Sequence, residues 1–323
     1  MFNLKSLKTS LIISVALGLV LILGFLSADK VKDPNAVQRD YSGSLEFGGI
    51  TRVYHIHIPP SYDRRNPAPL LFAFHGLGGD GKWMENETKL NETADQEGFI
   101  VVYPDGYKAS WSDGSGVTPA GRAGVDDVGF VSALIDKLAN ELQINLSRVY
   151  ATGFSNGAML SQRLACELSG KIAAIASVGG TMVEEISLQC NPERPISIMH
   201  IHGTEDRIVP WEGGEVRVGI SGWKILSVNA MLKKWAGLNA CSSSSKETYK
   251  LDRYFYRKEV HGEIYKNCKN ETEVIFYELE GAGHSWPGII MKKRLPKSAS
   301  DDTERDNHAE EIIWEFFERH TKK

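Results

Sequence analysis

Short apolar runs alternate with segments of helical spacing along most of this chain. The run APLLFAFHG at residues 68–76 is apolar until a glycine ends it, which is typical of a buried parallel strand. Residues 128–144 instead repeat apolar side chains at helical spacing, which predicts an amphipathic helix. Further strands are predicted at residues 51–60, 99–106, 148–157 (running into a turn), 172–180, 196–203 and 272–284, and further helices at 91–99, 157–168, 228–238 and 308–320. This alternation predicts the α/β class, with a mostly parallel central sheet and helices on both faces.

The domain organisation follows from where this alternation begins and where it is interrupted. A single domain is expected over residues 45–320, because no repeat and no second core are visible. Residues 29–44 are charged at their start and include Pro34, so a linker is predicted there. Residues 211–271 are rich in Trp, Tyr, Gly and Ser, and they predict a small lid or an antiparallel addition.

The first 28 residues differ from the rest of the chain. Lys5 and Lys8 precede an apolar run from Leu11 to Leu26, and Ser27 and Ala28 follow it. This order is typical of a secretory signal peptide, which we favour over an uncleaved N-terminal anchor. In both cases the rest of the chain is expected outside the cytoplasm, and a membrane contact is expected only if the segment is not cleaved.

The composition is ordinary for a globular protein, and the cysteine usage fits an exported one. The 323 residues carry a net charge of −4 and no dominant basic patch, which argues against nucleic-acid binding. The four cysteines include no CxxC pair, so zinc or thioredoxin-like chemistry is not expected. Pairing of sequence neighbours would give Cys166–Cys190 and Cys241–Cys268, which we favour over four buried thiols. Each bridge would stabilise the fold by about 3 kcal/mol.

A serine stands between two glycines where a predicted strand turns into a predicted helix. The sequence GFSNG at residues 153–157 places Ser155 on a strand–turn–helix elbow, which frees a serine hydroxyl from the sheet. A G-x-S-x-G pattern alone is weak, since an ordinary strand-to-helix corner would also use glycine. Its position after a buried strand favours Ser155 as a nucleophile.

A serine nucleophile needs a base and an acid, and both are expected at the carboxyl ends of other strands. His284 follows the last predicted strand in a glycine-rich loop and is the favoured base. Asp206 follows the strand before it and is the favoured acid, with Glu205 as the local alternative. The chain order Ser155, Asp206, His284 is the one used by serine hydrolases with this kind of sheet. His200 and His202 are interpreted as structural residues.

Donors for a reaction oxyanion are expected from two backbone positions. The N–H of Asn156 at the start of the predicted helix is one. The other is expected from the HGLGG loop after residues 68–74, with Leu77 favoured and Gly76 as the alternative.

Two further features close to these segments give weaker functional predictions. Asp126 and Asp127 precede a helix, and we interpret them as capping residues rather than cation ligands, so no metal site is predicted. Trp111, Trp211 and Trp286 are predicted in loops near the reactive segments, where exposed indoles could stack on a substrate ring or pack a lid.

Several of these motifs together resemble one group of enzymes. AFHGLGGDG, WSDG, DDVGFVSALIDKL, RVYATGFSNGAML, HGTEDRIVPWEGG and GAGHSWPG are similar to the polyhydroxybutyrate depolymerase and feruloyl-esterase-like group of secreted α/β-hydrolases, related to carbohydrate esterase family one. The resemblance covers residues 45–320. It implies an α/β-hydrolase fold, a signal peptide, no cofactor, and a triad of Ser155, Asp206 and His284. Some relatives carry adjacent cysteines near WSDG, where this chain has Gly114 and Gly116.

The sequence therefore predicts a secreted serine carboxylic ester hydrolase. The expected substrates are hydroxyalkanoate oligomers or feruloylated or acetylated polysaccharides. A serine peptidase and an acyltransferase share the same site chemistry and remain alternatives. A catalytically inactive hydrolase-like binding protein is the alternative from a different class.

Overall fold

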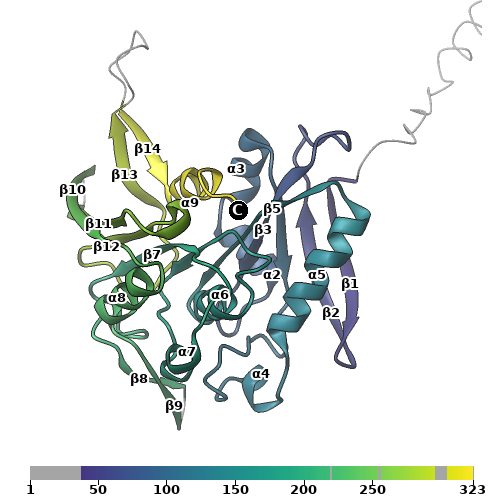
Figure 1. Ribbon diagram of the computed structural model, residues 1–323, viewed down its shortest axis with the longest axis horizontal. Helices are drawn as coiled ribbons and strands as arrows, with labels where there is room; N and C mark the ends of the chain where they lie inside the picture. The colour runs from purple at the N-terminus through teal and green to yellow at the C-terminus, as the bar shows by residue number, and fades with distance from the viewer. Residues whose placement is uncertain (1–37, 219, 254–255, 295–303, 323) are drawn as a thin grey trace, which may run out of the picture. The chain divides into compact units, whose positions relative to one another are not determined.

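A computed structural model describes residues 38–218, 220–253, 256–294 and 304–322 (Figure 1). The chain divides into two units, residues 1–38 and 39–323, and the described helices and strands belong to the second. The predicted signal segment at residues 1–28 lies outside the described residues. No helix in the described ranges is long and apolar enough to cross a membrane.

Ten strands in the described part of the chain form one mixed sheet in the order β1-β2-β4-β3-β5-β6-β7-β12-β11-β10. From β4 to β12 in this order, neighbouring strands are parallel. The two strands at each edge are antiparallel additions. The strands are β1 Asp40–Phe47, β2 Ile50–His57, β3 Ala68–Phe74, β4 Ile100–Pro104, β5 Ile144–Phe154, β6 Ala174–Val178, β7 Ser197–Gly203, β10 Ser243–Arg253, β11 Tyr256–Lys266 and β12 Val274–Leu279. The predicted α/β class with a mostly parallel sheet is confirmed.

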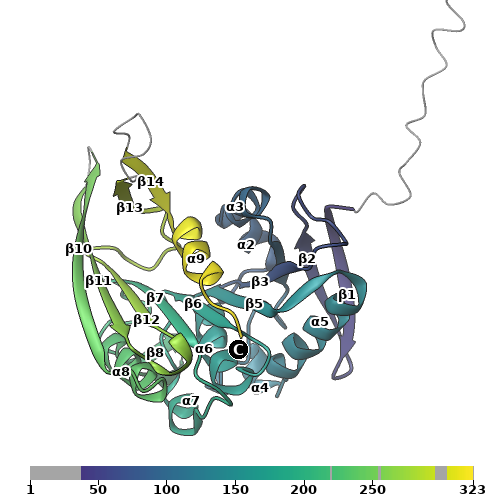
Figure 2. The same ribbon diagram turned by 45° about the horizontal axis from the view of Figure 1, so that its top comes forward.

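Helices cover both faces of this sheet (Figure 2). Helices α2, α3 and α9 lie on one face, and α5, α6 and α8 lie on the other. The helices are α2 Gly81–Glu87, α3 Leu90–Glu97, α4 Pro119–Arg122, α5 Asp127–Glu141, α6 Asn156–Glu167, α7 Glu184–Gln189, α8 Val228–Leu238 and α9 Ala309–Glu318, with a 3₁₀ turn at Lys269–Glu271.

The core reflects the two-sided burial that the continuous apolar runs predict. Every residue of β3, β4, β6 and β7 is buried. The last helix, α9, closes one face with aromatic rings. The indole of Trp314 stacks on Phe99 with ring centroids 3.9 Å apart, and Phe317 stacks on Tyr150 at 4.7 Å.

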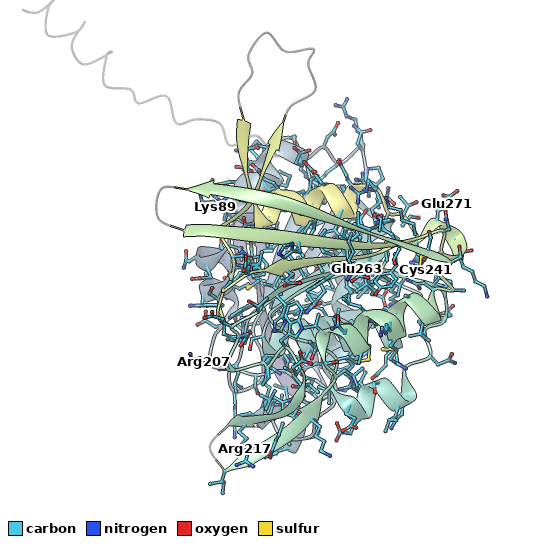
Figure 3. The ribbon with its side chains drawn as sticks, turned by 90° about the vertical axis from the view of Figure 1, so that its left-hand side faces the viewer. Lys89, Arg207, Arg217, Cys241, Glu263 and Glu271 are labelled. Carbon is cyan, nitrogen blue, oxygen red and sulfur yellow. A yellow bond between two sulfur atoms is a disulfide. The ribbon has the colours of Figure 1, made fainter. Side chains whose placement is uncertain are left out.

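The segment at residues 211–271, expected to hold a lid or an antiparallel addition, contains both a separate hairpin and added sheet strands. The hairpin consists of β8 Gly214–Val218 and β9 Ser221–Ile225, and it projects away from β10 and β11, which extend the main sheet (Figure 3). A second small hairpin, β13 Ile289–Arg294 with β14 Glu304–His308, precedes α9. The limits of the catalytic domain and the role of a lid remain predictions.

Two disulfide bonds join sequence neighbours. Cys166 at the end of α6 pairs with Cys190 after α7, and Cys241 after α8 pairs with Cys268. Figure 3 shows Cys241 beside the turn that carries Glu271. Such bonds persist in proteins that fold outside the cytoplasm.

The predicted linker at residues 29–44 extends too far along the chain. β1 begins at Asp40 and pairs with β2 along its whole length, so residues 40–44 belong to the sheet. The half-exposed alternation of this edge strand lacks the continuous apolar run by which the central strands are recognised.

Candidate active site

Ser155 stands at a sharp elbow between β5 and α6. Its φ of 55° and ψ of −117° lie in a region that residues other than glycine rarely adopt. The elbow depends on its two glycines. A Cβ on Gly153 would lie 2.4 Å from the backbone of Gly157, and one on Gly157 would lie 2.2 Å from the Phe74 carbonyl oxygen. No larger side chain fits at either position without moving the backbone.

Ser155, His284 and Asp206, which the sequence places far apart, form one hydrogen-bonded line. His284 Nδ1 lies 2.7 Å from Asp206 Oδ2, and His284 Nε2 lies 2.9 Å from Ser155 Oγ. A carboxylate accepts hydrogen bonds, so the Nδ1–H of His284 donates to Asp206. Nε2 is then free of hydrogen in the neutral ring and accepts the Ser155 hydroxyl. This is the arrangement that serine hydrolases use for nucleophilic attack.

The Asp206 carboxylate is held from its other side by the turn that follows it. The backbone N–H groups of Ile208 and Val209 donate to Oδ1 at 2.9 and 2.8 Å. Burial alone would raise the pKa of Asp206, but the hydrogen bonds from His284, Val209 and Ile208 outweigh it and lower the pKa. Asp206 is therefore ionised at neutral pH. Glu205, the local alternative, is exposed, and its backbone N–H donates to the Ala282 carbonyl.

The HGLGG loop places backbone N–H groups beside the serine. In the described part of the chain, the N–H groups of Leu77 and Asn156 have no hydrogen-bond acceptor. The carbonyl and the following N–H of a trans peptide point in opposite directions, so the orientation of the Gly76 carbonyl sets that of the Leu77 N–H. The Gly79 N–H donates to that carbonyl at 3.1 Å.

His75 also fixes this peptide, a role that we did not predict from the sequence. Burial lowers the pKa of His75, so its ring is neutral. Nε2 accepts the Gly106 N–H at 2.9 Å, and the Nδ1–H therefore donates to the Gly76 carbonyl at 2.7 Å. The position of His75 at the end of a buried strand was the available sequence signal.

The side chain of Asn156 ties the elbow to the WSDG loop. Its Oδ1 accepts the Trp111 N–H at 2.8 Å, and its Nδ2 donates to Asp113 Oδ2 at 2.9 Å. The Trp111 indole N–H donates to the His75 carbonyl at 2.9 Å. The loop is thus part of the support beneath the elbow.

The prediction of exposed substrate-binding indoles is wrong for Trp111 and Trp286. Trp111 is fully buried by the contacts just described. Trp286 is buried near α9, where its indole N–H donates to Glu310 Oε1 at 2.6 Å. Trp211 is partly buried and packs against the rings of His202 and Phe276.

A pocket of about 420 Å³ opens above Ser155. Two tryptophans that we did not predict, Trp83 on α2 and Trp223 on β9, line it. Val216 pairs with Trp223 across the β8–β9 hairpin, and both pack with Met159 and Val209. The remaining lining residues are Gly76, Leu77, Gly78, Gly79, Phe154, Ser155, Asn156, Ile208 and His284. The walls are therefore mainly apolar, with polar groups concentrated at the serine.

The paired carboxylates at the start of α5 have separate structural partners. Asp126 caps the helix by accepting the Gly129 N–H at 2.8 Å, which agrees with the capping interpretation. Asp127 is buried and pairs with Arg52 at 2.7 Å. In the described ranges, no group of three or more His, Cys, Asp or Glu side chains could hold a metal ion.

Comparison with known proteins agrees with this fold. The profile of a family described as Phospholipase/Carboxylesterase matches residues 61–218. Feruloyl esterase B of Piromyces equi is 29% identical over 71% of this chain and 42% of its own length. A bifunctional acetylxylan esterase/xylanase of Neocallimastix patriciarum is 29% identical over 73% of this chain and 31% of its own length. The chain thus spans less than half of these two relatives.

A solved structure shows the same fold. The acetyl xylan esterase from Aspergillus awamori aligns with a TM-score of 0.52 and 15% identity, over 76% of this chain and 94% of that one. The chain has the α/β-hydrolase fold, and in sequence it is similar to the phospholipase/carboxylesterase family and to the two esterases above. The relatives that it resembles are a feruloyl esterase and an acetylxylan esterase. The resemblance to polyhydroxybutyrate depolymerases remains a prediction.

Proposed function

We propose that this protein hydrolyses carboxylic esters through an acyl-enzyme on Ser155. The observation that carries the proposal is the hydrogen-bonded line from Asp206 through His284 to Ser155, set on a strained elbow. Ser155, Asp206 and His284 follow three different strands of the sheet, β5, β7 and β12. Such an arrangement is costly to maintain without a chemical role.

In the first half of the reaction, Ser155 Oγ attacks the ester carbonyl while its proton passes to His284 Nε2. Negative charge develops on the carbonyl oxygen, and the N–H groups of Leu77 and Asn156 stabilise it. The positive charge on His284 is stabilised by ionised Asp206. The alcohol then leaves with the proton from His284, and Ser155 carries the acyl group.

In the second half, water replaces the alcohol. His284 Nε2 takes a proton from the water, the hydroxide attacks the acyl carbonyl, and the acid leaves as Ser155 regains its proton. No other group is required to balance this step. The low pKa of Asp206 keeps its charge available throughout.

The apolar pocket supports a bulky acyl or alcohol group rather than acetate alone. Its volume of about 420 Å³ lies in the range of sites that hold drug-sized ligands. The indoles of Trp83 and Trp223 are suited to an aromatic ring. The two relatives are a feruloyl esterase and an acetylxylan esterase/xylanase. Together with the pocket, they support hydroxycinnamoyl esters of a polysaccharide as the preferred substrates and acetyl esters as the next best.

We further propose that the protein acts outside the cytoplasm. Two disulfide bonds support this location, as do the signal-like first 28 residues of the sequence. No nucleic-acid partner is proposed.

A substrate panel tests the proposal. Purified protein is assayed on methyl ferulate, acetylated xylan and hydroxybutyrate oligomers, with Ser155→Ala as the inactive control. We expect the highest kcat/KM on methyl ferulate and no turnover by the variant. Faster cleavage of amides would favour a peptidase, and transfer to a sugar in preference to water would favour an acyltransferase. A folded wild type without turnover would favour the inactive binding protein.

A further inference from the structure

Two buried histidines that the reaction above does not use lie side by side on β7. His200 and His202 point to the same face of the strand, and His200 Nε2 lies 3.1 Å from His202 Nδ1. Both residues are almost fully buried. Buried imidazole nitrogens are usually hydrogen-bonded. The partners of the other two nitrogens, His200 Nδ1 and His202 Nε2, therefore determine which nitrogen of each ring carries the hydrogen.

The partners of His200 form a chain that begins on α8. The Trp235 indole N–H donates to Gln162 Oε1 at 2.6 Å, and an indole N–H can only donate. The Gln162 amide must then donate through Nε2 to Ser177 Oγ at 2.7 Å. The Ser177 hydroxyl then donates its hydrogen to His200 Nδ1 at 2.8 Å, because its other acceptor, the Met199 carbonyl oxygen, is farther away at 3.4 Å. His200 therefore accepts at Nδ1 and carries its hydrogen on Nε2.

The other end of the chain fixes His202 in the same tautomer. Its Nε2 lies 2.9 Å from the Val209 carbonyl oxygen, which can only accept. The hydrogen of His202 is thus on Nε2, and Nδ1 accepts the Nε2–H of His200. Both rings are neutral, in agreement with the lowering of both pKa values by burial. We call the series Trp235, Gln162, Ser177, His200, His202 the buried relay.

The buried relay ends on the turn that holds the catalytic acid. Val209 donates its N–H to Asp206 Oδ1 at 2.8 Å and accepts His202 at its carbonyl. Asp206 Oδ2 is then directed at His284. The Nε2 of His202 is 3.5 Å from Asp206 Oδ2, which is too long for a direct hydrogen bond. Its influence on the carboxylate therefore passes through the Val209 peptides.

We propose that His202 is a positioning residue for Asp206, kept in its working tautomer by a one-way hydrogen-bond relay from Trp235 on α8. This inference rests on the proposed ester hydrolysis for its kinetic consequence but not for its structural one. When the relay is intact, the turn at residues 206–209 presents Oδ2 to His284. When it is broken, the turn loses one of its fixed points and the His284–Asp206 hydrogen bond loosens.

Two substitutions of His202 separate the hydrogen bond to Val209 from the bulk of the ring. In His202→Gln the amide nitrogen is placed near the position of Nε2 and can still donate to Val209. In His202→Asn the amide reaches only the position of Nδ1, so the Val209 carbonyl loses its donor. His320→Asn is the control, because His320 is a buried histidine that binds Ser197 and Glu273 at the opposite end of β7.

The experiment has a spectroscopic and a kinetic arm. In wild-type protein with ¹⁵N-labelled histidine, NMR should show both His200 and His202 as Nε2–H tautomers. The downfield proton resonance of His284 Nδ1–H should shift or broaden in His202→Asn and stay in place in His202→Gln and His320→Asn. On p-nitrophenyl acetate, His202→Asn should lower kcat by about tenfold with a smaller change in KM, and His202→Gln should restore most of this loss.

An Nδ1–H tautomer at either ring, or an unchanged His284 resonance in folded His202→Asn, would overturn the proposal. An inactive wild type that still shows both tautomers and the resonance change would refute the ester hydrolysis but not the relay. A fall in kcat of the same size in His320→Asn would show that any buried histidine in contact with β7 has this effect, which also overturns it.

Discussion

At the scale of single residues, the site depends on which hydrogen each group can give or receive. Ser155 takes a strained backbone conformation that directs its hydroxyl away from the sheet. His284 can remove the hydroxyl proton only if its own hydrogen is on Nδ1, and the ionised carboxylate of Asp206 keeps it there. The proposed ester hydrolysis thus requires one tautomer of His284.

Replacement of Asp206 by Asn reverses this tautomer. The Asn amide would donate to His284 Nδ1 and move the ring hydrogen to Nε2, where it blocks transfer of the serine proton. We expect kcat to fall by about 10⁴-fold while the melting temperature changes little. Initial rates on p-nitrophenyl acetate measure this. Glu205→Gln, at the exposed neighbouring position, is the control, and a loss of similar size there would refute the assignment.

The residues proposed to react could be predicted from the sequence, and those that shape the pocket could not. Ser155, Asp206 and His284 follow buried strands, and parallel strands bring their carboxyl ends to one edge. Trp111 and Trp286 also lie near these segments in the sequence, but both are buried. Their indole N–H groups are hydrogen-bonded to acceptors inside the fold. Whether an indole faces solvent depends on partners distant in sequence.

At the scale of elements, the β8–β9 hairpin is the part of the pocket that the sequence pattern did not resolve. Its strands are short and pair with each other, apart from one bridge between Ile225 and Val183, and no continuous apolar run marks them. β10 also lacks a continuous apolar run, because its first half is polar, as an edge strand can be. The buried central strands, in contrast, were recognisable from their uninterrupted apolar sequence.

Shortening the aromatic side chain of this hairpin should change substrate preference. Trp223→Ala removes one apolar wall of the pocket, so KM for methyl ferulate should rise by about tenfold, with a smaller rise for p-nitrophenyl acetate. Trp223→Phe keeps a ring at this position and should remain close to wild type. Equal changes for both substrates would contradict a role of Trp223 in binding the aromatic ring of the substrate.

The two disulfide bonds should contribute similarly to stability. They close loops with sequence separations of 24 and 27 residues, so their loop-closure entropies are close. Replacing both cysteines of either pair by serine should lower the free energy of unfolding by about 3 kcal/mol. Urea titrations of the two double variants measure this. A loss below about 1 kcal/mol in both would show that these bonds do not hold the fold.

At the scale of the whole domain, buried neutral histidines make stability depend on pH. Burial lowers the pKa of His75, His200 and His202 below the usual value of 6.5. Below that value the unfolded chain binds protons that the folded chain does not, so stability falls as the pH decreases. The buried carboxyls of Asp113 and Asp127, whose pKa values burial raises, act in the opposite direction.

A variant that lacks one of these histidines isolates the effect. Between about pH 6.5 and 5.5, a buried histidine that stays neutral in the folded protein costs about 1 kcal/mol of stability, because the unfolded chain takes up the proton that the folded chain does not. The slope of unfolding free energy against pH should therefore be shallower by about this amount in His202→Gln than in wild type. Urea titrations across this range measure the slope. Parallel lines would mean that His202 is protonated in the folded protein.

The central claim, that Ser155 is the nucleophile and His284 its base, is tested most directly with a fluorophosphonate probe. Intact-mass measurement followed by peptide mapping should show one adduct per chain, on the peptide that carries Ser155. Ser155→Ala should take no label, and His284→Ala should react far more slowly while it remains folded. An adduct on another residue, or labelling of Ser155→Ala at the wild-type rate, would contradict the account.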